Sequence, residues 1–272
     1  MRSNRGGARG RRTLLLASVK NADEARSALE GGADILDAKD PAAGALGACS
    51  PSALLAIVAV RDAALRESGA PRRIPVSAAL GDAPDLPGAL ALAAAGAVAC
   101  GADDLKFGLR GVADEGEAIR LGRAIVRAAR RCAPPGRRLR VVLVAYAEAE
   151  SIGSLPPRAL PRVAASAEAD GCLIDTALKD GRTLFDHLGE ADLEPFLRAC
   201  RRRGLLCALA GSLALGDLPR LLALAPDLIG LRGALCGDGR QGRLEAERVR
   251  RFREALHGGP PESGVQGAAL RG

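Results

Sequence analysis

Aromatic side chains are nearly absent from this 272-residue chain, which has four Phe, one Tyr and no Trp. Its core must therefore be built from Ala, Leu, Val and Ile, a composition that suits parallel strands covered by helices. The scarcity also disfavours binding of single-stranded nucleic acid, whose bases stack on aromatic rings. The formal net charge of +7 leaves a basic nucleic-acid-binding protein as the non-enzymatic alternative. Such a protein would carry its arginines on one face of the folded domain.

Much of the positive charge lies in the first twelve residues, which contain five arginines and no acid. We interpret residues 1–12 as a disordered basic tail and expect no nucleic-acid partner. Residues 258–272 are rich in Gly and Pro and are predicted to form a second disordered tail. The length between them, residues 13–257, fits a single large α/β domain.

Signatures of metal, disulfide and membrane proteins are missing as well. The seven cysteines show no Cys-x-x-Cys or Cys/His spacing, which predicts reduced, buried cysteines and no metal site. No apolar run approaches the roughly eighteen residues of a membrane span. The short apolar run at residues 13–18 is followed at once by the polar residues 20–24, unlike a signal peptide. We therefore expect a cytoplasmic protein with no membrane partner and no cofactor.

Lysine is the other rare residue, since the 39 basic residues include only Lys20, Lys39, Lys106 and Lys179. The last three lie at or just past the ends of predicted strands, in the segments LDAKD, DDLKFG and IDTALKDG. In parallel α/β folds, active sites are built at that end of the strands. An arginine cannot lose its proton, whereas a lysine in a desolvated or cation-rich pocket can, and can then form an imine. Lysine at these positions therefore predicts amine chemistry.

Short apolar runs alternate with longer amphipathic segments from residue 13 onwards. The strand-like runs cover residues 14–18, 35–39, 74–80, 104–109, 139–146, 172–176, 206–210 and 228–232. The helical segments lie near residues 22–30, 51–68, 87–100, 114–132, 157–168, 192–203, 214–224 and 244–256. Eight alternations predict a (β/α)8 TIM barrel. A doubly wound sheet is the runner-up, but residues 18–21 lack the Gly-rich phosphate turn that it would need.

A weak internal repeat supports the barrel. A small residue and an aspartate precede each even-numbered predicted strand, at Asp34, Asp103, Asp170 and Asp227. Their separations of 69, 67 and 57 residues each correspond to two strand–helix units, as a closed ring of eight strands would require. Because these aspartates lie at the starts of strands, we interpret them as structural caps.

The strongest site pattern combines Asp175 with Lys179. Asp175 ends the sixth predicted strand, and Lys179 follows four residues later in the next loop. A carboxylate beside an amine can hold the amine charged or relay protons while an imine forms. An ordinary ion pair is the alternative, but Lys39 and Lys106 argue against it. Strands two, four and six of a barrel point their ends toward one another, and crowded amines lower one another's pKa.

A second pattern follows the last two predicted strands. Gly211 and Ser212 come after strand seven, and Arg232 and Gly233 come after strand eight. Barrels commonly bind phosphate there, through backbone N–H groups that only glycine lets a ligand approach closely. We predict that these four residues bind a substrate phosphate, with ordinary turn chemistry as the alternative.

Five segments together resemble the (5-formylfuran-3-yl)methyl phosphate synthase family over roughly residues 14–256. They are LLASVKNADEARSALEGGADILDAKDPAAGALGA, DDLKFGLRGV, IDTALKDGRTLFD, CALAGSL and IGLRGALC. The resemblance implies a TIM-barrel lyase of methanofuran biosynthesis. Its reaction condenses two molecules of glyceraldehyde 3-phosphate into a phosphorylated furan aldehyde and releases phosphate and water.

The resemblance also implies residue roles. Lys39 matches the Schiff-base lysine, Lys106 the proton-transferring lysine, and Asp175 and Lys179 the acid and lysine of strand six. Asp40 departs from the family pattern, which more often has Asn there, and the two tails have no counterpart. A class I aldolase-like or phosphosugar-isomerising barrel with the same lysines is the enzymatic alternative. The expected partners are glyceraldehyde 3-phosphate and further copies of the chain in a homo-oligomer.

Overall fold

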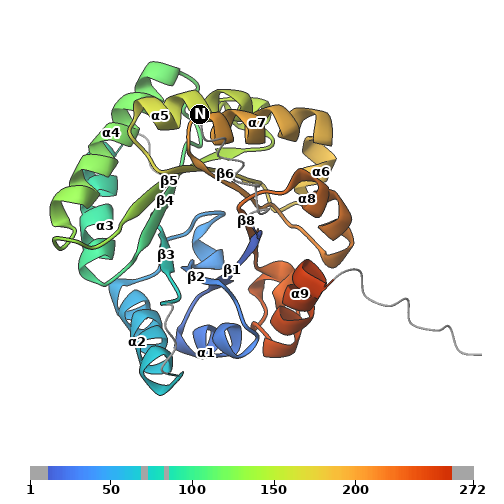
Figure 1. Cartoon of the computed structure of the whole chain (residues 1–272). Coiled ribbons are helices and arrows are strands. Elements are labelled where there is room, and N and C mark those ends of the chain that lie inside the picture. The colour runs from blue at the N-terminus through green and yellow to red at the C-terminus, as the bar shows by residue number, and fades with distance from the viewer. Residues whose placement is uncertain (1–11, 69–72, 83–85, 259–272) are drawn as a thin grey trace, which may run out of the picture.

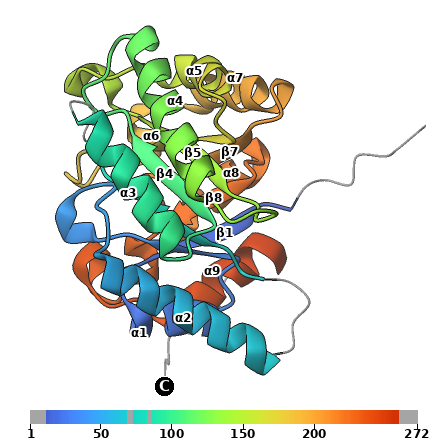
Figure 2. The same ribbon diagram turned by 90° about the vertical axis from the view of Figure 1, so that its left-hand side faces the viewer.

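Eight parallel strands form a closed barrel with helices around it (Figures 1 and 2). The computed structural model of the chain describes residues 12–68, 73–82 and 86–258. Each strand pairs with the next, and β8 closes the ring by pairing with β1. The strands are β1 Leu14–Val19, β2 Ile35–Ala38, β3 Val76–Ala79, β4 Asp104–Gly108, β5 Arg140–Tyr146, β6 Gly171–Asp175, β7 Leu206–Leu209 and β8 Leu228–Leu231. The predicted (β/α)8 TIM barrel is confirmed.

All eight predicted helical segments contain helices. These are α1 Ala22–Glu30, α2 Pro51–Ser68, α3 Pro87–Ala99, α4 Glu115–Cys132, α5 Leu160–Ser166, α7 Glu190–Arg202, α8 Leu218–Leu224 and α9 Ala246–Gly258. The helices α5 and α8 begin three or four residues later than predicted because a single 3-10 turn precedes each, Pro157–Ala159 before α5 and Leu215–Asp217 before α8. The short helix α6, Leu184–His187, was not predicted, since four residues are too few to show a helical period.

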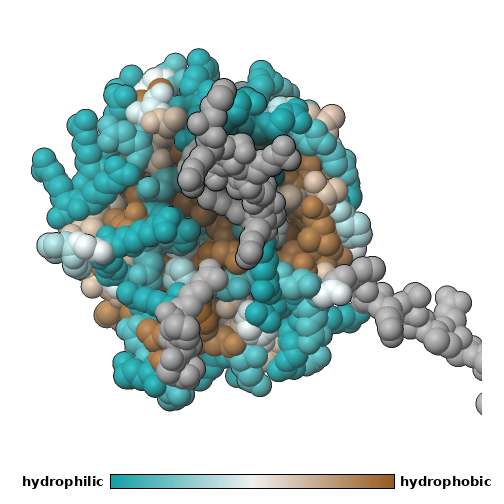
Figure 3. Space-filling model, viewed as in Figure 1, coloured by the Kyte–Doolittle hydropathy of each residue, from teal (hydrophilic) through white to brown (hydrophobic). Residues whose placement is uncertain are grey.

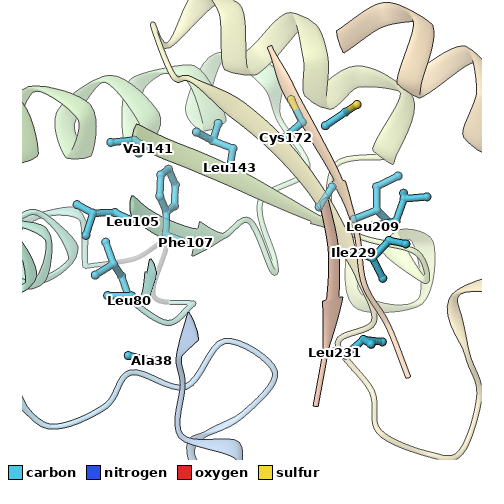
Figure 4. Close-up of a cluster of buried hydrophobic side chains, with 14 of the residues drawn as sticks. Ala38, Leu80, Leu105, Phe107, Val141, Leu143, Cys172, Leu209, Ile229 and Leu231 are labelled. Atoms are coloured by element: carbon cyan, nitrogen blue, oxygen red, sulfur yellow. The ribbon is translucent and has the colours of Figure 1, made fainter. Parts of the chain in front are cut away.

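The barrel wall separates two apolar clusters, because successive side chains of a strand point to opposite faces. In β5, Val141 and Leu143 point outward into the layer between strands and helices. Figure 4 shows this outer layer, which also contains Leu105, Phe107, Leu209 and Ile229. Val142 and Val144 point inward and fill the barrel with Leu16, Leu173 and Ala208. The outer layer contains most of the buried apolar residues, and the inner cluster is small.

The four repeated aspartates cap strands, as predicted from their positions. Each carboxylate accepts a backbone N–H at the start of the preceding odd-numbered strand. The pairs are Asp34 with Leu15, Asp103 with Val76, Asp170 with Val141 and Asp227 with Cys207, at 2.9, 3.0, 2.8 and 2.9 Å. The repeat therefore belongs to the end of the barrel where the strands begin, away from Lys39, Lys106 and Lys179.

The two ends of the described chain lie side by side. The Nε of Arg12 donates a hydrogen bond to Nδ1 of His257, 2.8 Å away. Apart from Arg12 and Gly258, the predicted tails at residues 1–12 and 258–272 lie outside the described residues.

On the face shown in Figure 3, hydrophilic residues lie mostly around the edge and hydrophobic residues gather toward the middle. Within residues 12–68, 73–82 and 86–258, no helix is long and apolar enough to cross a membrane.

Candidate active site

The predicted catalytic side chains converge at the end of the barrel where the strands finish, here called the mouth. Lys39 directly follows β2, Asp175 is the last residue of β6, and both are buried. Lys106 is also buried, but it lies inside β4, two residues before the strand's last residue. Lys179 follows in the loop after β6, and its side chain is 21% exposed. The sequence thus predicted four residues that the fold brings together.

Asp175 connects two of the lysines. Its Oδ2 lies 3.8 Å from Nζ of Lys39, and its Oδ1 accepts from Nζ of Lys179 at 3.2 Å. Lys179 also donates to Oγ1 of Thr176 at 2.8 Å, and the backbone N–H of Thr176 donates to Asp175. One carboxylate therefore forms an ion pair with both amines and a hydrogen bond with Lys179.

Lys106 has a different partner, Asp37, which the sequence analysis did not single out. Nζ of Lys106 donates to Oδ2 of Asp37 at 2.7 Å, and Oγ of Ser18 donates to the same oxygen at 2.7 Å. Asp37 is fully buried, and its Oδ1 accepts no hydrogen bond within the described part of the chain. The signal was present in the sequence, because residues two apart on a strand share a face and Asp37 is two residues before Lys39.

These contacts shift the acidities of the site. Burial lowers the pKa of Lys39, the charge of Asp175 opposes this, and Lys106 lowers it further, so that the pKa is about 8. Burial raises the pKa of Asp175, but the positive charges of Lys179, Lys39 and Lys106 outweigh it and bring the value to about 2. In the same way, Lys106 and Lys39 outweigh burial and lower the pKa of Asp37. The site therefore holds ionised carboxylates beside an amine that can become neutral near physiological pH.

A cavity of about 290 Å³ opens beside these groups. It is lined by Lys39, Lys106, Asp175 and Lys179 on one side and by the loops after β7 and β8 on the other. All four predicted phosphate-binding residues line it, namely Gly211, Ser212, Arg232 and Gly233. The lysine amines and the glycine-containing loops therefore line the same cavity.

The loop after β7 is held in an unusual backbone conformation. Gly211 has φ +111°, and Ser212 has φ +52°, a left-handed value that is uncommon for a residue other than glycine. A Cβ on Gly211 would lie 3.0 Å from Cγ2 of Thr176, so the loop packs closely on the end of β6. Gly233 is less confined, since its nearest neighbour would be the backbone N of Arg240 at 3.7 Å.

Arg232 lines the cavity, but its guanidinium is already engaged. Its N–H groups donate to both carboxylate oxygens of Glu24 at 2.7 and 3.1 Å. They also donate to the carbonyl oxygens of Ser18, Arg240 and Gly242 at 3.0, 2.9 and 3.2 Å. All five guanidinium N–H groups are used by these bonds. Arg232 therefore contributes charge and holds neighbouring loops, and it would have to give up a bond to donate to a ligand.

A second polar pair lies at the same end of the barrel. The hydroxyl of Tyr146, the last residue of β5, donates to Oδ1 of Asp82 at 2.5 Å. Burial raises the pKa of both groups. The hydrogen bond from Tyr146 opposes this rise for Asp82, whereas the charge of Asp82 adds to the rise in the pKa of Tyr146. A Cβ on Gly108 would lie 1.6 Å from Oδ1 of Asp82, so only glycine at the end of β4 leaves room for the pair.

Within the described ranges, no group of three or more His, Cys, Asp or Glu side chains could hold a metal ion.

Comparison with known proteins places this site in a family. The family model described as 4-HFC-P synthase matches residues 15–253, nearly the whole barrel. The chain belongs to the 4-HFC-P synthase family. The (5-formylfuran-3-yl)methyl phosphate synthase of Methanopyrus kandleri is 43% identical over 247 residues, which cover 90% of this chain and 99% of the relative. The synthase of the same name from Methanocaldococcus jannaschii is 39% identical, covering 89% and 98%. The predicted family resemblance is confirmed.

Solved structures share the fold of this family member at low identity. KGPDC from Streptococcus mutans, in complex with D-R5P, aligns with a TM-score of 0.58 at 16% identity, covering 90% of this chain and 97% of the other. The 3-hexulose-6-phosphate synthase from Salmonella typhimurium aligns with a TM-score of 0.56 at 19% identity, covering 90% and 100%. At these identities the likeness establishes the barrel architecture alone.

Proposed function

We propose that this 4-HFC-P synthase family member condenses two molecules of glyceraldehyde 3-phosphate into (5-formylfuran-3-yl)methyl phosphate. The atoms balance when one phosphate and two water molecules leave, which makes the protein a carbon–oxygen lyase acting on phosphates. The observation that carries the proposal is Lys39, a buried amine with a pKa of about 8 at the edge of the cavity. The names of the relatives supply the product, and the resemblance supplies its place in methanofuran biosynthesis.

The first step is attack of the neutral Lys39 amine on the aldehyde carbon of one substrate molecule. The resulting carbinolamine must lose its hydroxyl group as water to give the imine, and this loss needs a proton. Lys179 can supply that proton through Asp175, which contacts both amines. The buried position of Lys39 favours the step because it keeps part of the amine population unprotonated.

The imine then makes the neighbouring carbon acidic. The electron pair that remains when this carbon loses its proton is delocalised onto the imine nitrogen. Removal of that proton gives an enamine, which can expel phosphate from the next carbon and free that carbon for bonding to the second substrate. Lys106 is the proposed proton carrier, and Asp37 at 2.7 Å can exchange the proton with it. Closure of the ring with loss of two water molecules gives the aromatic furan, and hydrolysis of the imine consumes one water and releases the product aldehyde from Lys39.

The loops after β7 and β8 are proposed to bind a substrate phosphate. Gly211, Ser212 and Gly233 line the cavity, and backbone N–H groups near glycine suit phosphate oxygens. The left-handed backbone at Gly211 and Ser212 supports this role, since such conformations concentrate at ligand sites. Arg232 adds a positive charge close to the same loops.

The deciding experiment supplies glyceraldehyde 3-phosphate as the only substrate and follows products by mass spectrometry. A furan phosphate together with an equal amount of released phosphate is expected. A six-carbon aldol product or an isomerised triose without release of phosphate would instead establish an aldolase-like or isomerising barrel.

The lysine assignment has a separate test. Borohydride added during turnover reduces an imine to a stable amine, and peptide mapping then locates the adduct. It is expected on Lys39, and an adduct on Lys106 or Lys179 would overturn the assignment.

A further inference from the structure

The loop after β8 carries an arginine at its tip that the sequence analysis did not single out. An antiparallel bridge between Cys236 and Leu244 closes the base of this loop. Within it, the backbone N–H of Gly237 donates to the carbonyl oxygen of Arg243 at 3.1 Å. Arg240 lies at the turn, where its own carbonyl oxygen accepts from Nε of Arg232 at 2.9 Å. Its backbone is therefore fixed beside the cavity that its side chain lines.

The guanidinium of Arg240 reaches across the mouth to the loop that follows Lys39. Its Nη1 donates to the carbonyl oxygen of Pro41 at 3.0 Å and its Nη2 to that of Gly44 at 2.6 Å. These two bonds leave Nε and one hydrogen on each Nη without a partner in the described ranges. Arg240 thus has donors available, whereas Arg232 has none.

Arg240 also lacks a counter-ion. Among the described residues, no carboxylate oxygen lies within 4.0 Å of its guanidinium, and both of its acceptors are neutral carbonyls. The charged groups that face it are Asp175 and Asp40, at longer range, and Arg232. Burial lowers the pKa of Arg240, which reflects a cation that has lost water without gaining an ion pair. A partly desolvated cation of this kind is stabilised by an anion that enters the cavity.

We propose that Arg240 binds the phosphate group of the substrate, opposite the backbone N–H groups of Gly211 and Gly233, and gives the site its preference for phosphorylated aldehydes. The ligand's identity rests on the proposed function, whereas the binding of a phosphate group does not. Because the same guanidinium donates to Pro41 and Gly44, a bound phosphate and the loop next to Lys39 are held by one side chain.

The test replaces Arg240 by Gln, with Arg240→Lys as the charge-conserving variant. Binding of inorganic phosphate is measured by calorimetric titration, and borohydride-trapped imine formation is compared for glyceraldehyde 3-phosphate and for unphosphorylated glyceraldehyde. In Arg240→Gln we expect phosphate binding and kcat/KM for the phosphorylated aldehyde to fall by about ten- to a hundredfold, as for one charge-assisted contact. Trapping of unphosphorylated glyceraldehyde should stay near wild type, and Arg240→Lys should lie between the two.

Arg243→Gln is the matched control. It removes the same charge from a position three residues further along the chain, and the side chain of Arg243 does not line the cavity. It should bind phosphate like the wild type. Unchanged phosphate binding in Arg240→Gln would overturn the proposal. So would an equal loss of trapping for both aldehydes, because Arg240 would then only hold the loop. Failure of the wild type to form the furan product would refute the proposed function but leave the phosphate titration interpretable.

Discussion

At the scale of single residues, arginine and lysine occupy different kinds of position in this chain. Arginines serve structural ion pairs, such as the fully buried Arg61, whose Nη1 lies 2.7 Å from Asp103, and Arg232 with Glu24. Three of the four lysines are collected around one cavity. An arginine in a protein keeps its proton, so among these cations only the lysines can become neutral amines.

Replacing Lys39 or Lys106 by Arg tests this division. Each change keeps the charge, so a residue that merely pairs with a carboxylate should lose activity by no more than about tenfold. If Lys39 attacks a carbonyl and Lys106 carries a proton, kcat/KM should fall by about a thousandfold or more, roughly 4 kcal/mol of transition-state stabilisation. Steady-state rates on variants shown by thermal melts to be folded give the answer.

Lys20→Arg is the control for that series. Its Nζ lies 3.9 Å from Glu24, and it does not line the cavity, so activity should stay near wild type. Near-full activity of folded Lys39→Arg would eliminate imine chemistry.

The pKa of Lys39 predicts a pH profile. Only the neutral amine attacks the aldehyde, so the initial rate of imine trapping should rise with pH and level off above the pKa of about 8. Below that value the rate should fall about tenfold for each pH unit. An unperturbed lysine would instead give a midpoint near 10.4. A midpoint near 10 would therefore show that burial does not tune this amine.

At the scale of elements, a hydrogen bond to a buried glutamate holds the loop after β6. Oε1 of Glu148, a buried residue two positions after β5, accepts the backbone N–H of Leu178 at 2.7 Å. Lys179 is the next residue, so Glu148 fixes the loop that presents it. Glu148→Ala should lower kcat by about tenfold, whereas Glu148→Gln keeps an acceptor oxygen and should stay within about threefold of wild type. Equal kcat values for Glu148→Ala and wild type would show that the loop needs no such support.

The strand caps predict the opposite pattern, a loss of stability without a loss of chemistry. Asp103 accepts from the N–H at the start of β3 and pairs with Arg61, a fully buried side chain. Asp103→Ala leaves that guanidinium short of a partner and should lower the free energy of unfolding by about 3 kcal/mol. Asp34→Ala removes a single cap and should cost about 1 kcal/mol. Denaturant unfolding measures both, and the folded variants should keep wild-type kcat; a large loss of kcat would show coupling between the two barrel ends.

The sequence predicted elements well and long-range partners poorly. Strand and helix periods revealed the barrel, and strand ends revealed Lys39 and Asp175, because these signals are local. Arg232 shows the limit, since the carboxylate that engages it, Glu24, is 208 residues away. Nothing in a Gly-rich loop after β8 indicates that it turns back over the mouth to place Arg240 beside Pro41. Such contacts depend on how the ring closes.

At the scale of the whole molecule, the cavity and the proposed catalytic side chains lie at one end of the barrel. The amines come from the loops and strands up to Lys179, and the glycine-containing loops come from residues after β7. The other end carries the capping aspartates. Changes at that end should therefore affect stability, and changes at the mouth should affect rate.

Closure of the ring has a consequence for where the chain needs to start. β8 pairs with β1, and Arg12 contacts His257, so residues 12 and 258 could be joined by a short linker. New ends can then be opened between Pro135 and Gly136, an exposed turn before β5 at the capped end. This circular permutant should fold and keep activity within about tenfold, with a Tm lower by a few degrees.

Opening the same joined chain between Gly181 and Arg182 would instead cut the loop that carries Lys179, and activity should be lost even though that turn is equally exposed. If both permutants lost activity while folded, the order of the strands in the chain would matter to the reaction. If only the second did, the reaction would not require the chain to begin at β1, because a barrel that begins at β5 would close the same ring.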